Sequence, residues 1–229
     1  MIQQTTAILL FSRTAAAESM CKPVFCGNGT ANFKMWDYLY QKTLRIAKAT
    51  GLPIIISDER VQTGNCFGEK MANALTYGFA LGYSNLIVIG GDCPDLNMAM
   101  LHKVNRQINS NNDVVLGPDN RGGVYLFAIN KSVFNVTAFT NFAWQTRQLI
   151  KHFKQYVALF SVVTLSHLGD INTKENVIAS LHKFSISNSW RLLLLQIIAT
   201  NNVIYNCLIK IYQSLYLNSN KPLRAPPLF

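Results

Sequence analysis

Residues 86–95 read Leu-Ile-Val-Ile-Gly-Gly-Asp-Cys-Pro-Asp, and this stretch decides the fold of the 229-residue chain. Its four leading residues are apolar and mostly β-branched, as is typical of a strand buried on both faces. Two glycines break the strand and Asp92 follows, at the carboxyl end, where open α/β sheets bind ligands. Asp92 is therefore our candidate for holding a divalent metal against phosphate, with Asp95 beside it. The alternative is that Asp92 and Asp95 only cap a helix that begins near Asn97 and shape a turn.

Strand and helix patterns alternate along the rest of the chain. Strands are predicted at residues 5–11, 54–56, 86–89, 113–117, 124–129 and 157–165. Helices are predicted at residues 33–50, from the loop at 62–68 to residue 81, at about 97–109, at 145–155 and from residue 174. Residues 12–32 are predicted to form a loop. This alternation indicates an α/β fold with a largely parallel central sheet.

A change in composition near residue 185 divides the chain into a domain at residues 1–184 and an extension at residues 185–229. The segments 190–198 and 203–217 are rich in Leu, Ile and Tyr and poor in acids, and they are predicted to form two amphipathic helices. We expect them to pack on the domain. The alternative is a contact with a partner or a peripheral contact with a membrane surface.

The formal net charge of +10 is uneven along the chain. Residues 1–150 hold thirteen Lys and Arg against nine Asp and Glu, whereas residues 151–229 hold eight against two. The sequence has no dense run of Lys and Arg, so it favours a general preference for anions over a nucleic-acid partner.

Five cysteines, an odd number without zinc-ligand spacing, favour reduced thiols and a cytoplasmic protein. The first eleven residues lack the features of a signal peptide, and no apolar run reaches the roughly 18 to 20 residues of a membrane span. We therefore expect a soluble, cytoplasmic chain without a transmembrane segment.

Five segments, taken in order, resemble a bacterial family of glycosyltransferase-A-like (GT-A-like) proteins of unknown function, described as nucleotide-diphospho-sugar transferases. More distant relatives are molybdenum cofactor guanylyltransferase and 2-phospholactate guanylyltransferase. The matching segments are 62–74 (QxGxxFGE[RK]xxNA), 89–96 (IGxDxPxL), 115–125 (VLGPxxxGGxY), 144–146 (Trp-Gln-Thr) and 170–173 (Asp-Ile-Asn-Thr). They cover roughly residues 5–180.

The resemblance implies a three-layer, Rossmann-like fold that binds a nucleotide or nucleotide sugar beside the first strand. It also implies Mg²⁺ or Mn²⁺ held by Asp92 and Asp170, with Asp95 supporting Asp92 in catalysis. The residues expected to contact the nucleotide or substrate are Arg13, Lys22, Gln62, Gly64, Glu69, Arg121, Gly122, Gly123, Trp144 and Thr146. For Glu69 a solvated first helical turn is the alternative, and for the glycine pair an ordinary turn.

Two departures from the family pattern leave a second function open. Many members carry a basic GxxKTRL-like segment after the first strand, where this chain has residues 13–22 with only Arg13 and Lys22 as cations. Members often have Asp before the glycine pair, where this chain has Arg121. The first hypothesis is a transferase that uses a metal-bound nucleotide substrate. The second is a catalytically degenerate member that binds a nucleotide or serves as an interaction module, and a weaker third is a basic protein associated with RNA or membranes.

Overall fold

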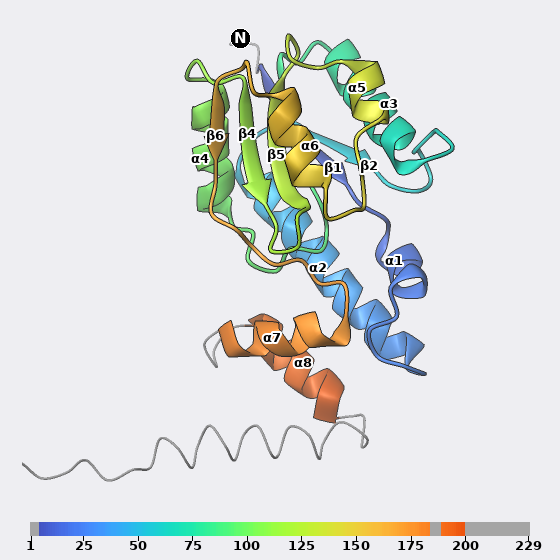
Figure 1. Ribbon diagram of the computed structural model, residues 1–229. Coiled ribbons are helices and arrows are strands. Elements are labelled where there is room, and N and C mark those ends of the chain that lie inside the picture. Colours follow the sequence, from blue (N-terminus) through green and yellow to red (C-terminus); the bar gives the residue numbers. More distant parts are fainter. Residues whose placement is uncertain (1–4, 184–188, 200–229) are drawn as a thin grey trace, which may run out of the picture. The chain divides into compact units, whose positions relative to one another are not determined.

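The computed structural model describes residues 5–183 and 189–199. Its strands are β1 (Thr6–Phe11), β2 (Ile54–Ser57), β3 (Asn85–Ile89), β4 (Val114–Pro118), β5 (Val124–Asn130) and β6 (Val162–Thr164). Its helices are α1 (Ala15–Cys21), α2 (Gly29–Ala49), α3 (Phe67–Ala80), α4 (Met98–Ile108), α5 (Val136–Thr140), α6 (Leu149–Tyr156), α7 (Lys174–Lys183) and α8 (Ser189–Ala199). Figure 1 shows the strands side by side in one sheet.

The sheet has the strand order β2-β1-β3-β5-β4-β6. Strand β1 pairs in parallel with both β2 and β3, and β4 pairs in parallel with β6. Strand β5 is antiparallel to its two neighbours. The prediction of an α/β fold with a largely parallel sheet is therefore confirmed, with β5 as the antiparallel strand.

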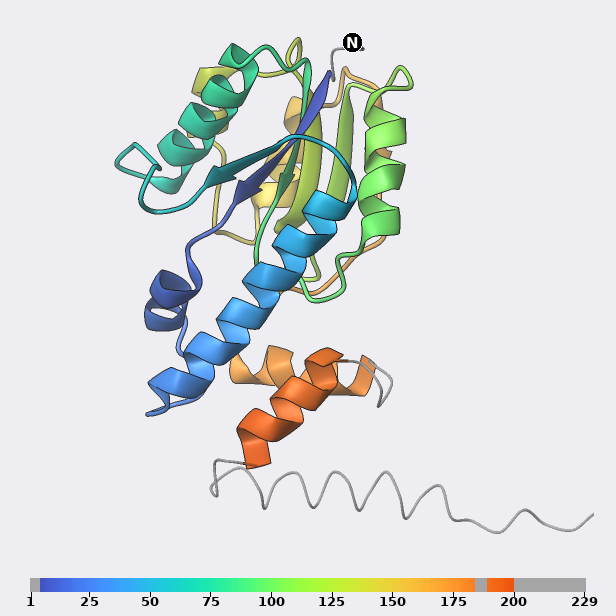
Figure 2. The ribbon, with the colours of Figure 1, turned by 180° about the vertical axis from the view of Figure 1, so that it is seen from behind.

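Helices cover both faces of the sheet, as two opposite views show (Figures 1 and 2). Alternate residues of β1 explain why its apolar run is continuous: Leu9 packs with α3, α5 and α6 on one face, and Ile8 and Leu10 pack with α2 and α4 on the other. Strand β3 is divided in the same way. The carboxyl ends of β1 and β3 therefore emerge together from a core that is closed on both sides.

Several predicted boundaries were wrong. The predicted loop at 12–32 contains α1, because Thr14 caps the three alanines that follow by accepting a hydrogen bond from Ala17 N. It also contains the first turn of α2, which Asn28 caps. Of the strand predicted at 157–165, only β6 (Val162–Thr164) forms, because α6 extends to Tyr156 and a turn follows it.

Two further differences lie between β5 and α6. The short helix α5, capped by Asn135, was not predicted. The helix predicted at 145–155 begins only at Leu149. Gln145 has a positive φ of 60°, which is not helical, and the residues between it and Leu149 form a loop.

The described residues belong to two compact units that divide between Ser180 and Leu181. Helix α8 matches the first helix predicted for the extension. The second, predicted at 203–217, lies outside the described residues. None of the helices in the described ranges is long and apolar enough to cross a membrane. The packing of the extension on the domain stays a prediction.

Candidate functional site

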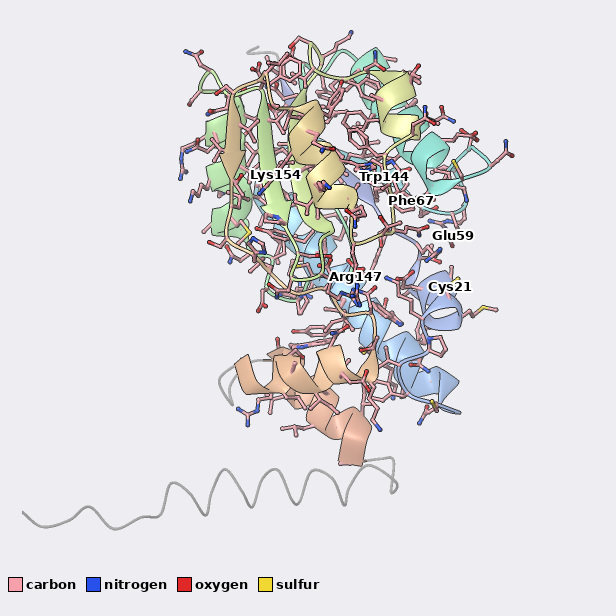
Figure 3. The ribbon with its side chains drawn as sticks, viewed as in Figure 1. Cys21, Glu59, Phe67, Trp144, Arg147 and Lys154 are labelled. Atoms are coloured by element: carbon pink, nitrogen blue, oxygen red, sulfur yellow. The ribbon has the colours of Figure 1, made fainter. Side chains whose placement is uncertain are left out.

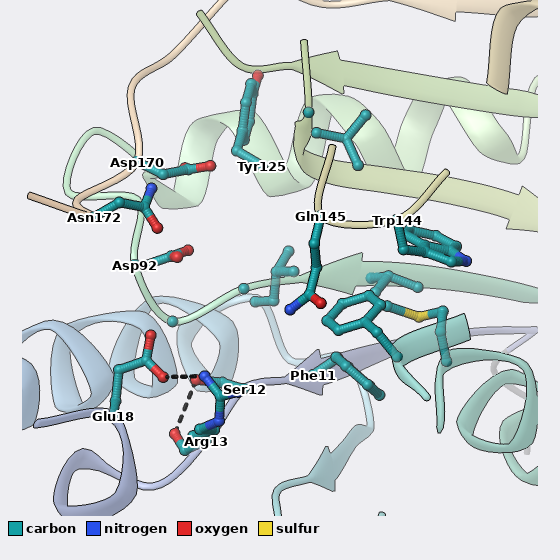
Figure 4. A pocket seen from close by; sticks show the side chains of 18 of the residues that line it. Phe11, Ser12, Arg13, Glu18, Asp92, Tyr125, Trp144, Gln145, Asp170 and Asn172 are labelled. Atoms are coloured by element: carbon teal, nitrogen blue, oxygen red, sulfur yellow. Dashed lines mark hydrogen bonds and ion pairs between the residues drawn. The ribbon is translucent and has the colours of Figure 1, made fainter. Parts of the chain in front are cut away.

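A cavity of about 660 Å³ opens at the carboxyl ends of β1 and β3. Its acidic lining residues are Glu18, Glu59, Asp92, Asp119 and Asp170, and its basic ones are Arg13, Lys22, Lys70, Arg121 and Arg147. Figure 4 shows Asp92 and Asp170 close to one another, between the Arg13–Glu18 pair and Tyr125. The cavity therefore has the position and the mixed charge expected of a site for a metal-bound anion.

Asp92 and Asp170 come from the loop after β3 and the loop before α7. A backbone hydrogen bond holds the two loops together, with Ile171 N donating to Asp92 O at 2.8 Å. The Oδ1 atom of Asp170 is buried and has no hydrogen-bond partner. Burial, followed by the charges of Asp92 and Asp119, raises the pKa of Asp170 to about 8. The fold thus brings two carboxyl groups together at one end of the cavity.

Lys22 links this pair to the loop after β1. Its ammonium lies 3.0 Å from Asp92 Oδ2 and 2.7 Å from Glu18 Oε1. Glu18 is buried and also accepts a hydrogen bond from Arg13 Nη1 at 3.0 Å. Burial lowers the pKa of Lys22, but the carboxylates of Asp92 and Glu18 outweigh burial and raise it. Glu18 therefore holds two cations beside Asp92.

The donor set of the carboxyl pair fits Mg²⁺ or Mn²⁺, which prefer oxygen ligands and retain positions for water or phosphate oxygens. The partnerless Oδ1 of Asp170 is the observation that supports this fit. Within the described ranges, no three acidic, histidine or cysteine side chains gather to hold a metal ion. Asp92 and Asp170 would therefore need a ligand or water to complete the coordination.

The other end of the cavity is aromatic. Phe67 packs against Phe11 and Trp144, with ring centroids 5.3 and 5.4 Å apart. Trp144 is fixed by a hydrogen bond of 2.5 Å from its Nε1 to Phe139 O. Figure 3 shows Phe67 and Trp144 next to one another beside the sheet. This end offers flat apolar surfaces to a planar ring, next to the charged end.

The cavity brings together most of the residues predicted for the site. Those that line it are Arg13, Lys22, Gln62, Asp92, Arg121, Gly123, Trp144, Thr146 and Asp170. Gly64, Glu69, Asp95 and Gly122 are not among its lining residues. Glu69 Oε2 instead accepts a hydrogen bond from Asn65 N at 2.6 Å. The alternative that Asp92 and Asp95 cap the next helix is wrong, because Asn97 is the cap of α4 and accepts a hydrogen bond from Met100 N. Asp95 does lie in a turn, as the other half of that alternative predicted.

Glu18 and Asp119 line the cavity but were not predicted. Glu18 precedes Lys22 by four residues, the spacing of a helical ion pair, and would have been found had α1 been predicted. Asp119 Oδ1 accepts hydrogen bonds of 2.7 Å from Arg121 N and Gly123 N. It therefore holds the loop that carries Arg121, a role that its place before a glycine pair could have suggested.

Many solved structures resemble the chain, among them the following three. The first, from Desulfovibrio desulfuricans G20, is named as a putative nucleotide-diphospho-sugar transferase. Its sequence is 20% identical to this chain, and the TM-score is 0.71 over 85% of this chain and 95% of that chain. The CMP:2-keto-3-deoxy-manno-octonic acid synthetase complexed with CTP is 12% identical, with a TM-score of 0.45 over 84% and 99%. Rv0371c complexed with manganese, from Mycobacterium tuberculosis H37Rv, is 14% identical, with a TM-score of 0.43 over 80% and 100%.

The first likeness shows that the chain shares the fold of the Desulfovibrio protein, and the two with TM-scores below 0.5 carry no further weight. No curated protein matches the chain. The model of a family described as uncharacterized proteins conserved in bacteria, DUF2064, matches residues 17–146, which include most of α1, all of β3 and the Asp92 loop. Since this match spans more than half of the 229 residues, the chain belongs to the DUF2064 family.

Proposed function

We propose that this chain is a transferase that binds a nucleotide or nucleotide sugar through Mg²⁺ or Mn²⁺. The observation that carries the proposal is the pair of Asp92 and Asp170, with Asp170 Oδ1 buried and without a partner inside the cavity. Burying an acid without a hydrogen bond is costly, so a cation that needs both carboxylates would relieve that cost. The fold shared with the Desulfovibrio protein is consistent with this activity.

Different residues of the cavity would bind different parts of the ligand. Asp92 and Asp170 would hold the metal, which neutralises phosphate charge and aligns the phosphates for transfer. Arg13 and Lys22 would add positive charge on the side of β1, where Glu18 positions both. The aromatic end formed by Phe11, Phe67 and Trp144 would stack against the base. Gln62 also lines the cavity, and because its side-chain nitrogen donates to Ser57 O, its side-chain carbonyl would be available to the edge of the base.

Calorimetric titration of the full chain tests this function. The ligands are nucleoside triphosphates and nucleotide sugars, each with Mn²⁺ and with EDTA. We expect at least one ligand to bind in a metal-dependent way, and binding to be lost in Asp92→Asn. The carboxamide has nearly the shape of the carboxylate but lacks the charge that a hard cation requires. Binding by none of these ligands would refute the proposal.

One observation favours the second candidate, a degenerate member that binds nucleotides without catalysis. The ammonium of Lys22 already sits 3.0 Å from Asp92 Oδ2, where it neutralises the carboxylate that a metal would use. If Lys22 replaced the metal, nucleotide binding would persist in EDTA and no turnover would be observed with any acceptor. Turnover that requires metal and disappears in Asp92→Ala would exclude this candidate.

A further inference from the structure

Three of the five cations that line the cavity make no ion pair. Arg13 and Lys22 are bound by Glu18 and Asp92. Within the described part of the chain, the side chains of Lys70, Arg121 and Arg147 take part in no hydrogen bond or ion pair. The acid nearest in sequence to Arg121 is Asp119, and Asp119 is already engaged by backbone N–H groups of its own loop. The cavity therefore offers three cationic side chains that stand outside the ion pairs of Glu18 and Asp92.

Arg121 extends this charge toward the carboxyl pair. It lies on the loop between β4 and β5, on the other side of Asp92 from the β1 loop with Arg13. The start of this loop pairs with the segment before Asp170, because Asp119 forms a β-bridge with Leu168 and Leu168 N donates a hydrogen bond to Pro118 O. Arg121 and Asp170 therefore line the same part of the chain's cavity.

Arg147 adjoins Arg121 through the backbone. Gly122 lies so close to Arg147 that a Cβ on this glycine would come within 2.2 Å of Arg147 O. Ile150 N also donates a hydrogen bond of 2.9 Å to Gly122 O, which joins the two loops a second time. Both arginines line the cavity, and Figure 3 shows Arg147 on the side where β1 and β3 end.

We propose that Arg121 and Arg147 form a second anion subsite, which binds a phosphomonoester group of the acceptor. Two guanidinium groups match the two charges of a phosphomonoester, and their forked donors suit its oxygens better than an ammonium does. The two arginines line the same cavity as the carboxyl pair and Lys22, so an acceptor held here would face the phosphates of the nucleotide. The assignment of the anion as acceptor rests on the proposed function, whereas the subsite itself does not.

Binding of inorganic phosphate to the full chain tests the subsite. The titration is done at pH 8 in EDTA, so that neither metal nor nucleotide contributes. We expect Arg121→Gln and Arg147→Gln each to weaken phosphate binding about tenfold. The matched control is Arg106→Gln, which removes the same charge from an exposed position on α4 outside the cavity and should bind like the wild type. The unchanged melting temperature of each variant confirms folding, since neither arginine side chain has a partner to lose.

A further arm defines the class of the anion. Acetate should bind more weakly than phosphate because it carries one charge. The subsite is overturned if the wild type does not bind phosphate or if both arginine variants bind like Arg106→Gln. Acetate that binds as tightly as phosphate overturns the phosphomonoester assignment. Phosphate binding at the arginines without any nucleotide binding would refute the proposed function alone. Metal-dependent nucleotide binding without phosphate binding at the arginines would refute the subsite alone.

Discussion

At the scale of single residues, the site depends on how charge is balanced around Asp92. Lys22, Glu18 and Arg13 form a chain of ion pairs that ends on Asp92 Oδ2. Asp170 stands on the other side with a buried, partnerless oxygen. The folded chain therefore tolerates Asp170 best in its neutral form when no metal is bound, and this has a measurable effect on stability.

The free energy of unfolding of the metal-free protein should fall as the pH rises from about 4 to about 8. The part of this fall that comes from Asp170 should be absent in Asp170→Asn. The pKa of Asp170 is about 8 in the folded chain and 3.8 in the reference state. In that window the folded state keeps a proton that the unfolded state has lost, so raising the pH favours unfolding. Urea unfolding in EDTA, compared between wild type and Asp170→Asn at each pH, measures this difference. Parallel pH profiles would show that Asp170 ionises normally.

Lys22→Gln should bind Mn²⁺ more tightly than the wild type but bind the nucleotide less tightly. The ammonium competes with a metal for Asp92, and it also supplies charge to phosphate, a charge-assisted contact worth about tenfold in affinity. Two calorimetric titrations separate the effects, first with Mn²⁺ alone and then with nucleotide at saturating Mn²⁺. Equal affinities for both ligands in the two proteins would place Lys22 outside the site.

At the scale of elements, the loop between β4 and β5 is fixed by its contact with the loop before α6. Gly122 has a φ of 91°, and Gly27 has a φ of 71° with open space where its Cβ would be. Both Gly122→Ala and Gly27→Ala place a side chain in a left-handed conformation, at about 1 kcal/mol or more. Only Gly122→Ala also collides with Arg147 O, so we expect it to lower the melting temperature further. Equal melting temperatures would mean that the two loops adjust without cost.

The sequence predicts well those elements whose hydrophobic pattern can be recognised within the segment itself, without knowledge of contacts with distant residues. The runs at residues 7–11 of β1 and 86–89 of β3 are apolar because both faces of the sheet are buried, and the position of Asp92 follows from its place after β3. Helix α1 was missed because three alanines and a threonine cap carry no amphipathic pattern, and with α1 the role of Glu18 was missed. The charge chain joins Lys22 to Asp92 over 70 positions, and Asp170 meets Asp92 from a still more distant part of the sequence, so local pattern cannot reveal either contact.

At the scale of the whole molecule, residues 186–229 hold several leucines and isoleucines that some surface must cover. If they pack on the domain, as we predict, their deletion should cause aggregation or a lower melting temperature. If they serve a membrane or a partner, residues 1–185 should stay soluble and unfold cooperatively, with weaker binding to vesicles as the only loss. A truncated chain that melts at the temperature of the full chain would contradict the packing prediction.

The central claim is that Asp92 and Asp170 together hold one divalent metal. The most direct measurement is Mn²⁺ binding by the full chain, followed by electron paramagnetic resonance of the free ion. We predict one Mn²⁺ site in the wild type, lost in both Asp92→Asn and Asp170→Asn. The matched control, Asp95→Asn, changes the nearest acid in the same loop, which does not line the cavity, and should keep the site. Wild-type Mn²⁺ affinity in either Asp92→Asn or Asp170→Asn would contradict the claim.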